Sequence, residues 1–90
     1  MTGNIDDVRA PRSMKNIVEE VMDWLQRHAG TDKSLTSFEL CDDGVKAVWP
    51  ELHKSSPEAH LRVAVSIYYE IANRWGFEPT IPPIVKELVL

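Results

Sequence analysis

The sequence predicts an all-α fold: a small helical domain with three main helices and a C-terminal segment led by prolines. Apolar residues recur at spacings of three and four along residues 13–29 and 56–75. Both segments are bounded by residues that start and stop helices, and the second carries an apolar arc too wide for burial from one side. We therefore expect that arc to be covered by the rest of the chain or by a partner.

Length and composition indicate one globular domain. The chain has 90 residues, of which 43% are hydrophobic and 27% are charged. We expect residues 1–12, which hold few large apolar groups, to form a flexible N-terminal arm, and residues 13–90 to form a single helical domain. No apolar run approaches the ~18 residues of a membrane span, and the start lacks the apolar core of a signal peptide. With Cys41 as the only cysteine, we expect a cytoplasmic location.

The first main helix is predicted over residues 13–29. Ser13 can cap its start, and Gly30 stands where a glycine commonly ends a helix. Asp23 and Arg27 place opposite charges four residues apart on the outer face. The apolar side consists of Met14, Ile17, Val18, Val21, Met22 and Leu25, with Trp24 extending it sideways.

The middle of the chain is open to two readings. Residues 36–39 match a capping box, and apolar residues continue beyond them at helical intervals. We favour a helix from Thr36, interrupted near Gly44, with a second short helix or turn around residues 49–53, because Pro50 disfavours a helix that runs through it. The alternative is an α+β fold with a β-hairpin around Asp42-Asp43-Gly44, which is a good turn between two apolar runs.

The longest helix is predicted over residues 56–75. Ser56 can cap its start, Pro57 suits the first helical position, and Gly76 can adopt the left-handed conformation that ends a helix. Its wide apolar arc consists of Leu61, Ala64, Val65, Tyr68, Ile71, Ala72 and Trp75, broadened by Val63 and Ile67.

Residues 78–90 read EPTIPPIVKELVL. The prolines predict a stiff, extended connector, and one of the paired prolines can open a last helix that contains Ile84, Val85 and Leu88. An apolar ending of this kind predicts docking, either on the protein's own core or on a second copy of the chain.

No set of residues predicts catalysis or metal binding. The acidic neighbours of Cys41 would raise the pKa of its thiol and oppose the reactive thiolate. His53 and His60 with Asp42 and Asp43 lack the spacing of a metal site. No glycine-rich phosphate loop is present. We therefore expect no enzyme activity, no catalytic or metal-binding residue and no cofactor.

A polar cluster surrounds the start of the longest predicted helix, where a recognition helix would place its reading side chains. This suggests a helix-turn-helix-like DNA-binding transcriptional regulator as the alternative function. The net charge of −4 disfavours nucleic acid as the main partner. The expected link between the two helices is also longer than the tight turn of that motif. The residues that would contact DNA are Arg9, Arg12, His53, Lys54, His60 and Arg62.

The favoured function is a small non-enzymatic regulatory or adaptor protein that acts through protein–protein contact, as a homodimer. Tyr69 falls on the polar side of the longest predicted helix near Arg62, and tyrosine beside arginine is enriched at interface hot spots. We expect a protein partner or a second copy, and no membrane. The expected partner-binding residues are Arg62, Ser66, Tyr69 and Asn73 on that helix, and Ile84, Val85 and Leu88 in the tail.

Overall fold

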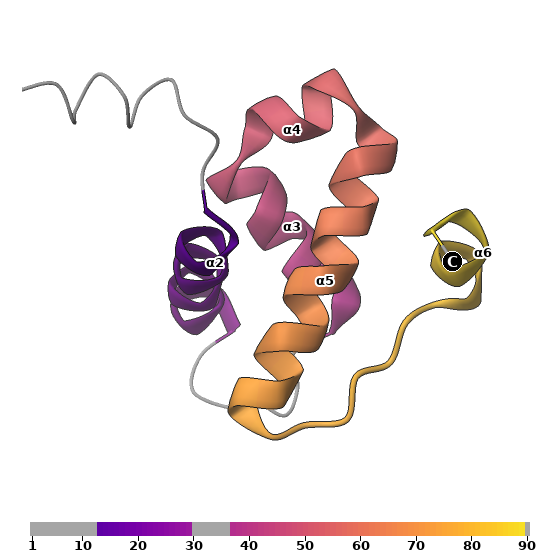
Figure 1. Cartoon of the computed structure of the whole chain (residues 1–90). Helices are drawn as coiled ribbons and strands as arrows, with labels where there is room; N and C mark the ends of the chain where they lie inside the picture. The colour runs from indigo at the N-terminus through magenta and orange to yellow at the C-terminus, as the bar shows by residue number, and fades with distance from the viewer. Residues whose placement is uncertain (1–12, 30–36, 90) are drawn as a thin grey trace, which may run out of the picture.

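The computed structural model describes residues 13–29 and 37–89, and within them the chain folds into five α-helices (Figure 1). The N-terminal arm expected over residues 1–12 lies outside the described residues. No strand occurs in the described ranges, so the all-α prediction is confirmed and the hairpin alternative is wrong. The helices are α2 (Met14–Ala29), α3 (Phe38–Val48), α4 (Pro50–Ser55), α5 (Pro57–Trp75) and α6 (Pro83–Val89).

Helix α2 confirms the prediction for residues 13–29. The Ser13 hydroxyl accepts a hydrogen bond from the Asn16 N–H at 3.2 Å, which satisfies a donor of the first turn. Asp23 and Arg27 form the expected ion pair. The apolar side faces inward and contributes Ile17, Val18, Val21 and Leu25 to the core.

The start and end of α3 follow local signals. The helix begins at Phe38 with Ser37 as its cap, since the Ser37 hydroxyl accepts a hydrogen bond from the Leu40 N–H at 3.2 Å, and Thr36, where we expected the helix to begin, lies outside the described residues. The helix ends at Val48, just before Trp49, and Pro50 opens the short helix α4. A proline fits there because the first N–H groups of a helix have no partner within it.

Gly44 does not interrupt α3, in contrast to our expectation. It is buried inside the helix against α2. A Cβ atom at this position would lie 3.1 Å from Trp24 Cε3 and 3.2 Å from Val21 Cγ1. The glycine therefore serves close packing between two helices and makes no turn.

Helix α5 begins and ends as predicted. The Ser56 hydroxyl accepts a hydrogen bond from the Ala59 N–H at 3.1 Å. At the other end Gly76 has a φ of 75°, and its N–H and that of Phe77 both donate to the Ala72 carbonyl.

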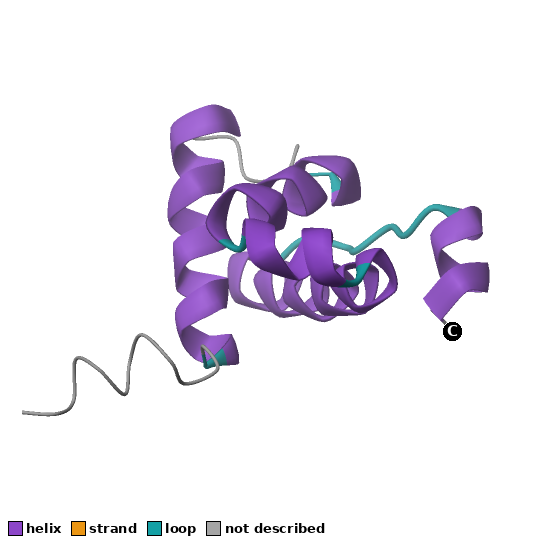
Figure 2. Ribbon diagram, turned by 90° about the horizontal axis from the view of Figure 1, so that it is seen from above, coloured by secondary structure: helices purple, strands orange, loops and turns teal. Residues whose placement is uncertain are grey.

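The wide apolar arc of α5 is covered by the chain itself. Helices α2, α3, α4 and α6 all contact α5, which runs through the middle of the molecule (Figures 1 and 2). Ile67 and Ile71 have no exposed surface as a result. A second chain is therefore not needed to cover this arc. Self-association, if it occurs, must use other surfaces of the molecule.

The C-terminal segment docks on α5 with only part of its apolar side. Residues 77–82 run back alongside α5, and the Thr80 N–H donates a hydrogen bond to the Tyr68 hydroxyl at 3.2 Å (Figure 1). Ile81 and Val85 are buried, which confirms that the tail packs on the protein's own core. Helix α6 itself stands at the edge of the molecule (Figure 2).

Candidate functional site

The expected contact residues of α5 all lie on its exposed side. Arg62, Ser66, Tyr69 and Asn73 are each exposed. Arg62 lies near the start of the helix, where its guanidinium is 3.9 Å from a Glu58 carboxylate oxygen. The other three border two separate hollows, so this side of α5 is divided and does not form one continuous patch.

The first hollow lies between α2 and α5 and has a volume of about 420 Å³. Val18 is almost fully buried beneath it, and Met14 keeps 43% of its surface exposed. One wall is held in place, because Arg74 Nε donates to Glu70 Oε2 at 2.9 Å. The lining comes from Met14, Lys15 and Val18 of α2 and from Ser66, Glu70 and Arg74 of α5.

The second hollow lies beside the end of α5 and has a volume of about 380 Å³. Tyr69 and Asn73 form one side of it, and Phe77 and Pro79 form the other. The Tyr69 side chain, at 43% exposure, stands open to solvent. No charged side chain is among the residues that line this hollow.

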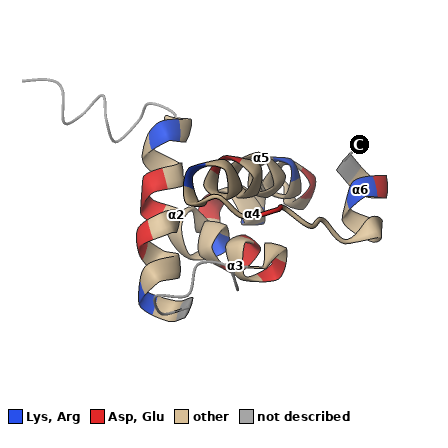
Figure 3. Cartoon of the chain, turned by 90° about the horizontal axis from the view of Figure 1, so that it is seen from below, with Lys and Arg blue, Asp and Glu red and all other residues tan. Residues whose placement is uncertain are grey.

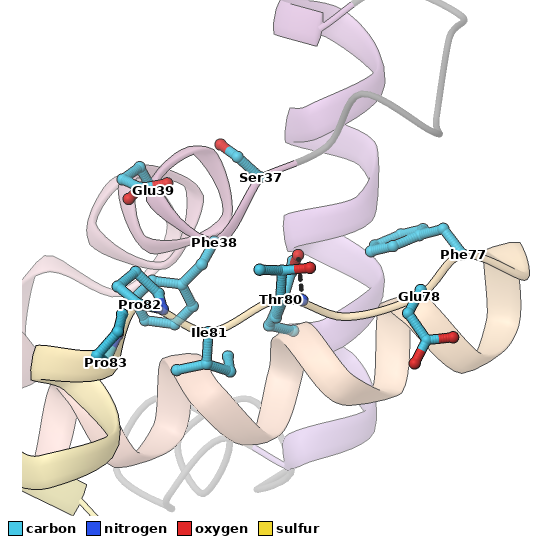
Figure 4. A pocket seen from close by; sticks show the side chains of 10 residues that line it. Ser37, Phe38, Glu39, Phe77, Glu78, Thr80, Ile81, Pro82 and Pro83 are labelled. Atoms are coloured by element: carbon cyan, nitrogen blue, oxygen red, sulfur yellow. Dashed lines mark hydrogen bonds between the residues drawn. The ribbon is translucent and has the colours of Figure 1, made fainter.

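A third hollow, of about 360 Å³, lies where residues 77–83 pass the first turn of α3 (Figure 4). Its aromatic floor is already packed, since the Phe38 and Tyr68 rings meet edge to face at 5.7 Å and both side chains are buried. Glu39 and Glu78 stand at its edge. Its geometry is that of a packing seam which holds the connector in place.

Helix α6 presents the most exposed apolar side chains in the described part of the chain. Ile84 is 67% exposed and Leu88 is 57% exposed, one helical turn apart and on the same side. Val85, which we expected at the same contact surface, is 8% exposed and faces the core. Two of the three tail residues are therefore available to a partner, and Val85 is not.

The polar cluster considered for DNA contact does not form one surface. Lys54 and Arg62 are exposed, but His53 is half-buried and His60 is 1% exposed. A DNA contact by His60 is incompatible with that burial, which corrects its expected place on the surface. Acidic and basic residues are interspersed on the helices in view (Figure 3). The two arm residues of this set, Arg9 and Arg12, lie outside the described residues.

His60 instead belongs to a partly buried polar network at the meeting of α3, α4 and α5. Its Nε2 lies 2.5 Å from Asp42 Oδ1, while Lys46 Nζ lies 3.3 Å from Asp42 Oδ2. The His53 ring meets the His60 ring edge to face at 4.9 Å. The Nδ1 atoms of both histidines are buried without a hydrogen-bond partner. In the sequence, His53 and His60 with Asp42 and Asp43 lack the spacing of a metal site, and no pattern there predicts the direct bond between His60 and Asp42.

Neither Cys41 nor the histidine network offers a reactive centre at the surface. Burial, and secondarily the Asp42 carboxylate, raise the pKa of the Cys41 thiol to about 12, so the thiol stays protonated at neutral pH. Within the described ranges, no three or more His, Cys, Asp or Glu side chains are grouped to hold a metal ion. Likewise, no helix in those ranges is long and apolar enough to cross a membrane.

Comparison with known proteins identifies no relative: no protein-family model, no curated protein and no solved structure matches the chain. Among the surfaces described, the exposed side of α6 carries the two most exposed large apolar side chains, Ile84 and Leu88, and the hollow between α2 and α5 carries a third, Met14.

Proposed function

We propose that the chain is a small non-enzymatic regulatory or adaptor protein that acts by protein–protein contact and associates with itself, a homodimer being the basic unit. One observation carries this proposal: α6 docks through Val85 yet leaves Ile84 and Leu88 mostly exposed on a single side. Exposed apolar residues are ordinary when scattered singly, whereas contiguous apolar surface marks interaction sites, and Ile84 and Leu88 are contiguous on one side of α6.

The energetics require more surface at the contact than α6 alone supplies. Covering Ile84 and Leu88 would stabilise a complex by roughly 1–2 kcal/mol for each side chain. Association costs at least about 4 kcal/mol in lost freedom of motion, so α6 alone is insufficient and further surface must be buried. Tyr69 and Met14, each 43% exposed, are the other large apolar side chains available in the described residues.

The state of two core side chains supports a non-enzymatic function. The Cys41 thiol has its pKa raised by burial, and His60 is held by Asp42 away from the surface. A cytoplasmic location remains part of the proposal, in keeping with a buried free thiol. The DNA-binding alternative has less support, because Lys54 and Arg62 are the only exposed members of its set among the described residues.

Sedimentation equilibrium over about 10 µM to 1 mM, the range of weak protein contacts, tests this proposal. We expect the mean mass of the wild-type chain to rise with concentration. The double variant Ile84→Ser/Leu88→Ser is expected to stay at the mass of one chain. Lys86→Ser, an exposed α6 residue on another side of the helix, is the matched control and should behave as wild type. A wild-type chain of single mass throughout would overturn the proposal.

A further inference from the structure

The exposed side of α6 has an apolar counterpart on the opposite edge of the same molecule. The hollow between α2 and α5 is walled by Met14 and floored by Val18. Figures 1 and 2 both place α2 and α6 on opposite sides of α5. With α6 docked through Val85 as observed, its exposed side cannot reach the hollow of its own chain.

We infer that the exposed side of α6 from one copy seats in the α2/α5 hollow of a second copy, so that the chains meet head to tail. This inference rests on the proposed function and names the surface that receives α6. The hollow, at about 420 Å³, is large enough to take the ends of two aliphatic side chains. The contact would cover Met14, Ile84 and Leu88, three of the four large apolar side chains exposed in the described residues.

Charge complementarity supports the same occupant. Glu87 is exposed beside Leu88 at the edge of the apolar side of α6, and Lys15 lies at the edge of the hollow. Within the described part of the chain, neither has an ion-pair partner, whereas Arg74 at the hollow is already bonded to Glu70. A Glu87–Lys15 pair between copies would add little affinity at the surface, but two like charges at the same place would repel each other, so the pair sets the orientation of α6 in the hollow.

The symmetry of such a contact has a measurable consequence. A head-to-tail pair uses one α6 and one hollow, and it leaves the other α6 and the other hollow free. The homodimer is then the first step of an assembly that grows with concentration or closes into a ring. A two-fold contact of α6 with α6 would instead stop at two chains.

Complementation between two defective variants tests this arrangement. Ile84→Ser/Leu88→Ser removes the apolar side of α6 and keeps the hollow, whereas Met14→Asp alters the hollow and keeps α6. Aspartate is tolerated at the first position of α2 because a carboxylate suits a helix start. We expect each variant alone to remain a single chain at concentrations where wild type associates. Mixed in equal amounts, they should form a complex of two chains that grows no further.

A charge exchange provides a second test that leaves the core untouched. Lys15→Glu and Glu87→Lys should each weaken self-association, and the double variant Lys15→Glu/Glu87→Lys should restore it. Lys54→Glu, an exposed lysine outside the hollow, is the charge-matched control and should leave association unchanged. Circular dichroism melts establish that each variant is folded, and if Met14→Asp fails to fold, the charge exchange decides.

The outcomes separate this inference from the proposed function. If Met14→Asp associates as wild type does while Ile84→Ser/Leu88→Ser does not, α6 pairs with another surface and this inference is overturned, with the proposed function intact. Failure of the two variants to complement each other also overturns it. If the wild-type chain never associates, the self-association of the proposed function itself is overturned.

Discussion

His60 on α5 donates a hydrogen bond from Nε2 to Asp42 Oδ1 on α3, at 2.5 Å and across eighteen positions of sequence. An ionised carboxylate can only accept, so the proton lies on Nε2. Lys46 contacts the second carboxylate oxygen at 3.3 Å. Since His60 is 1% exposed, this bond satisfies a polar group that has lost its water.

Replacing Asp42 with alanine should destabilise the protein by about 1–3 kcal/mol, because the buried His60 N–H loses its acceptor. Urea unfolding followed by circular dichroism measures the change. Asp43→Ala removes a neighbouring but exposed carboxylate and is the control, expected within about 0.5 kcal/mol of wild type. Equal stabilities of the two variants would show that the bond contributes nothing.

Gly44→Val should lower the melting temperature, although helix propensity taken alone favours valine over glycine. The cause is overpacking, which typically costs about 1–3 kcal/mol, because even a Cβ atom at Gly44 would lie 3.1 Å from Trp24 Cε3. Ala47→Val places the same side chain on the exposed side of α3 and should have a small effect. A higher melting temperature for Gly44→Val would mean that α2 shifts away from α3 at little cost and accommodates the larger side chain.

Cys41 should react with a thiol reagent far more slowly in the folded protein than in denaturant. Its pKa is raised from 9.0 to about 12, so at pH 8 almost no thiolate forms in the fold. The same shift in pKa makes the free energy of unfolding depend on pH. The contribution of Cys41 to stability is complete below about pH 9 and is lost as pH rises towards about 12, because the thiol ionises at a lower pH in the unfolded chain than in the fold. Absorbance-monitored labelling with and without urea measures the ratio, and equal rates would contradict the burial.

Deletion of residues 84–90 should both lower the melting temperature and abolish self-association. The first effect follows from loss of Val85, which is buried, and the second from loss of the exposed side of α6. Ile84→Ser/Leu88→Ser separates the two, because it should abolish association while leaving the melting temperature near that of wild type. Unchanged mass and melting temperature after the deletion would refute both roles of the tail.

Much of the fold could be read from local signals. Ser56 and Gly76 mark the ends of α5 within one residue, and Ser13 marks the start of α2. These residues act on the backbone groups of a single turn, so their effect does not depend on distant parts of the chain. Periodicity in the same segments predicts which side of each helix is buried, and that too is a property of one helix alone.

Other features depend on how the helices pack together. Gly44 resembles a turn residue until α2 is placed against it, and only the Trp24 contact explains a glycine within a helix. In the candidate contact surface, Ile84, Val85 and Leu88 are equivalent by sequence. The docking of α6 on α5 decides that Val85 is buried and the other two are exposed.

Local backbone preference therefore settled α2, α5 and the break at Pro50, because caps, prolines and apolar spacing act within a few residues, whereas the continuity of α3 through Gly44 depends on its packing against α2. Tertiary packing settled which polar groups meet and which apolar groups stay exposed. His60 and Asp42 show the difference: each reads as a surface residue on its own helix, and burial forces them to pair only when α3 and α5 come together.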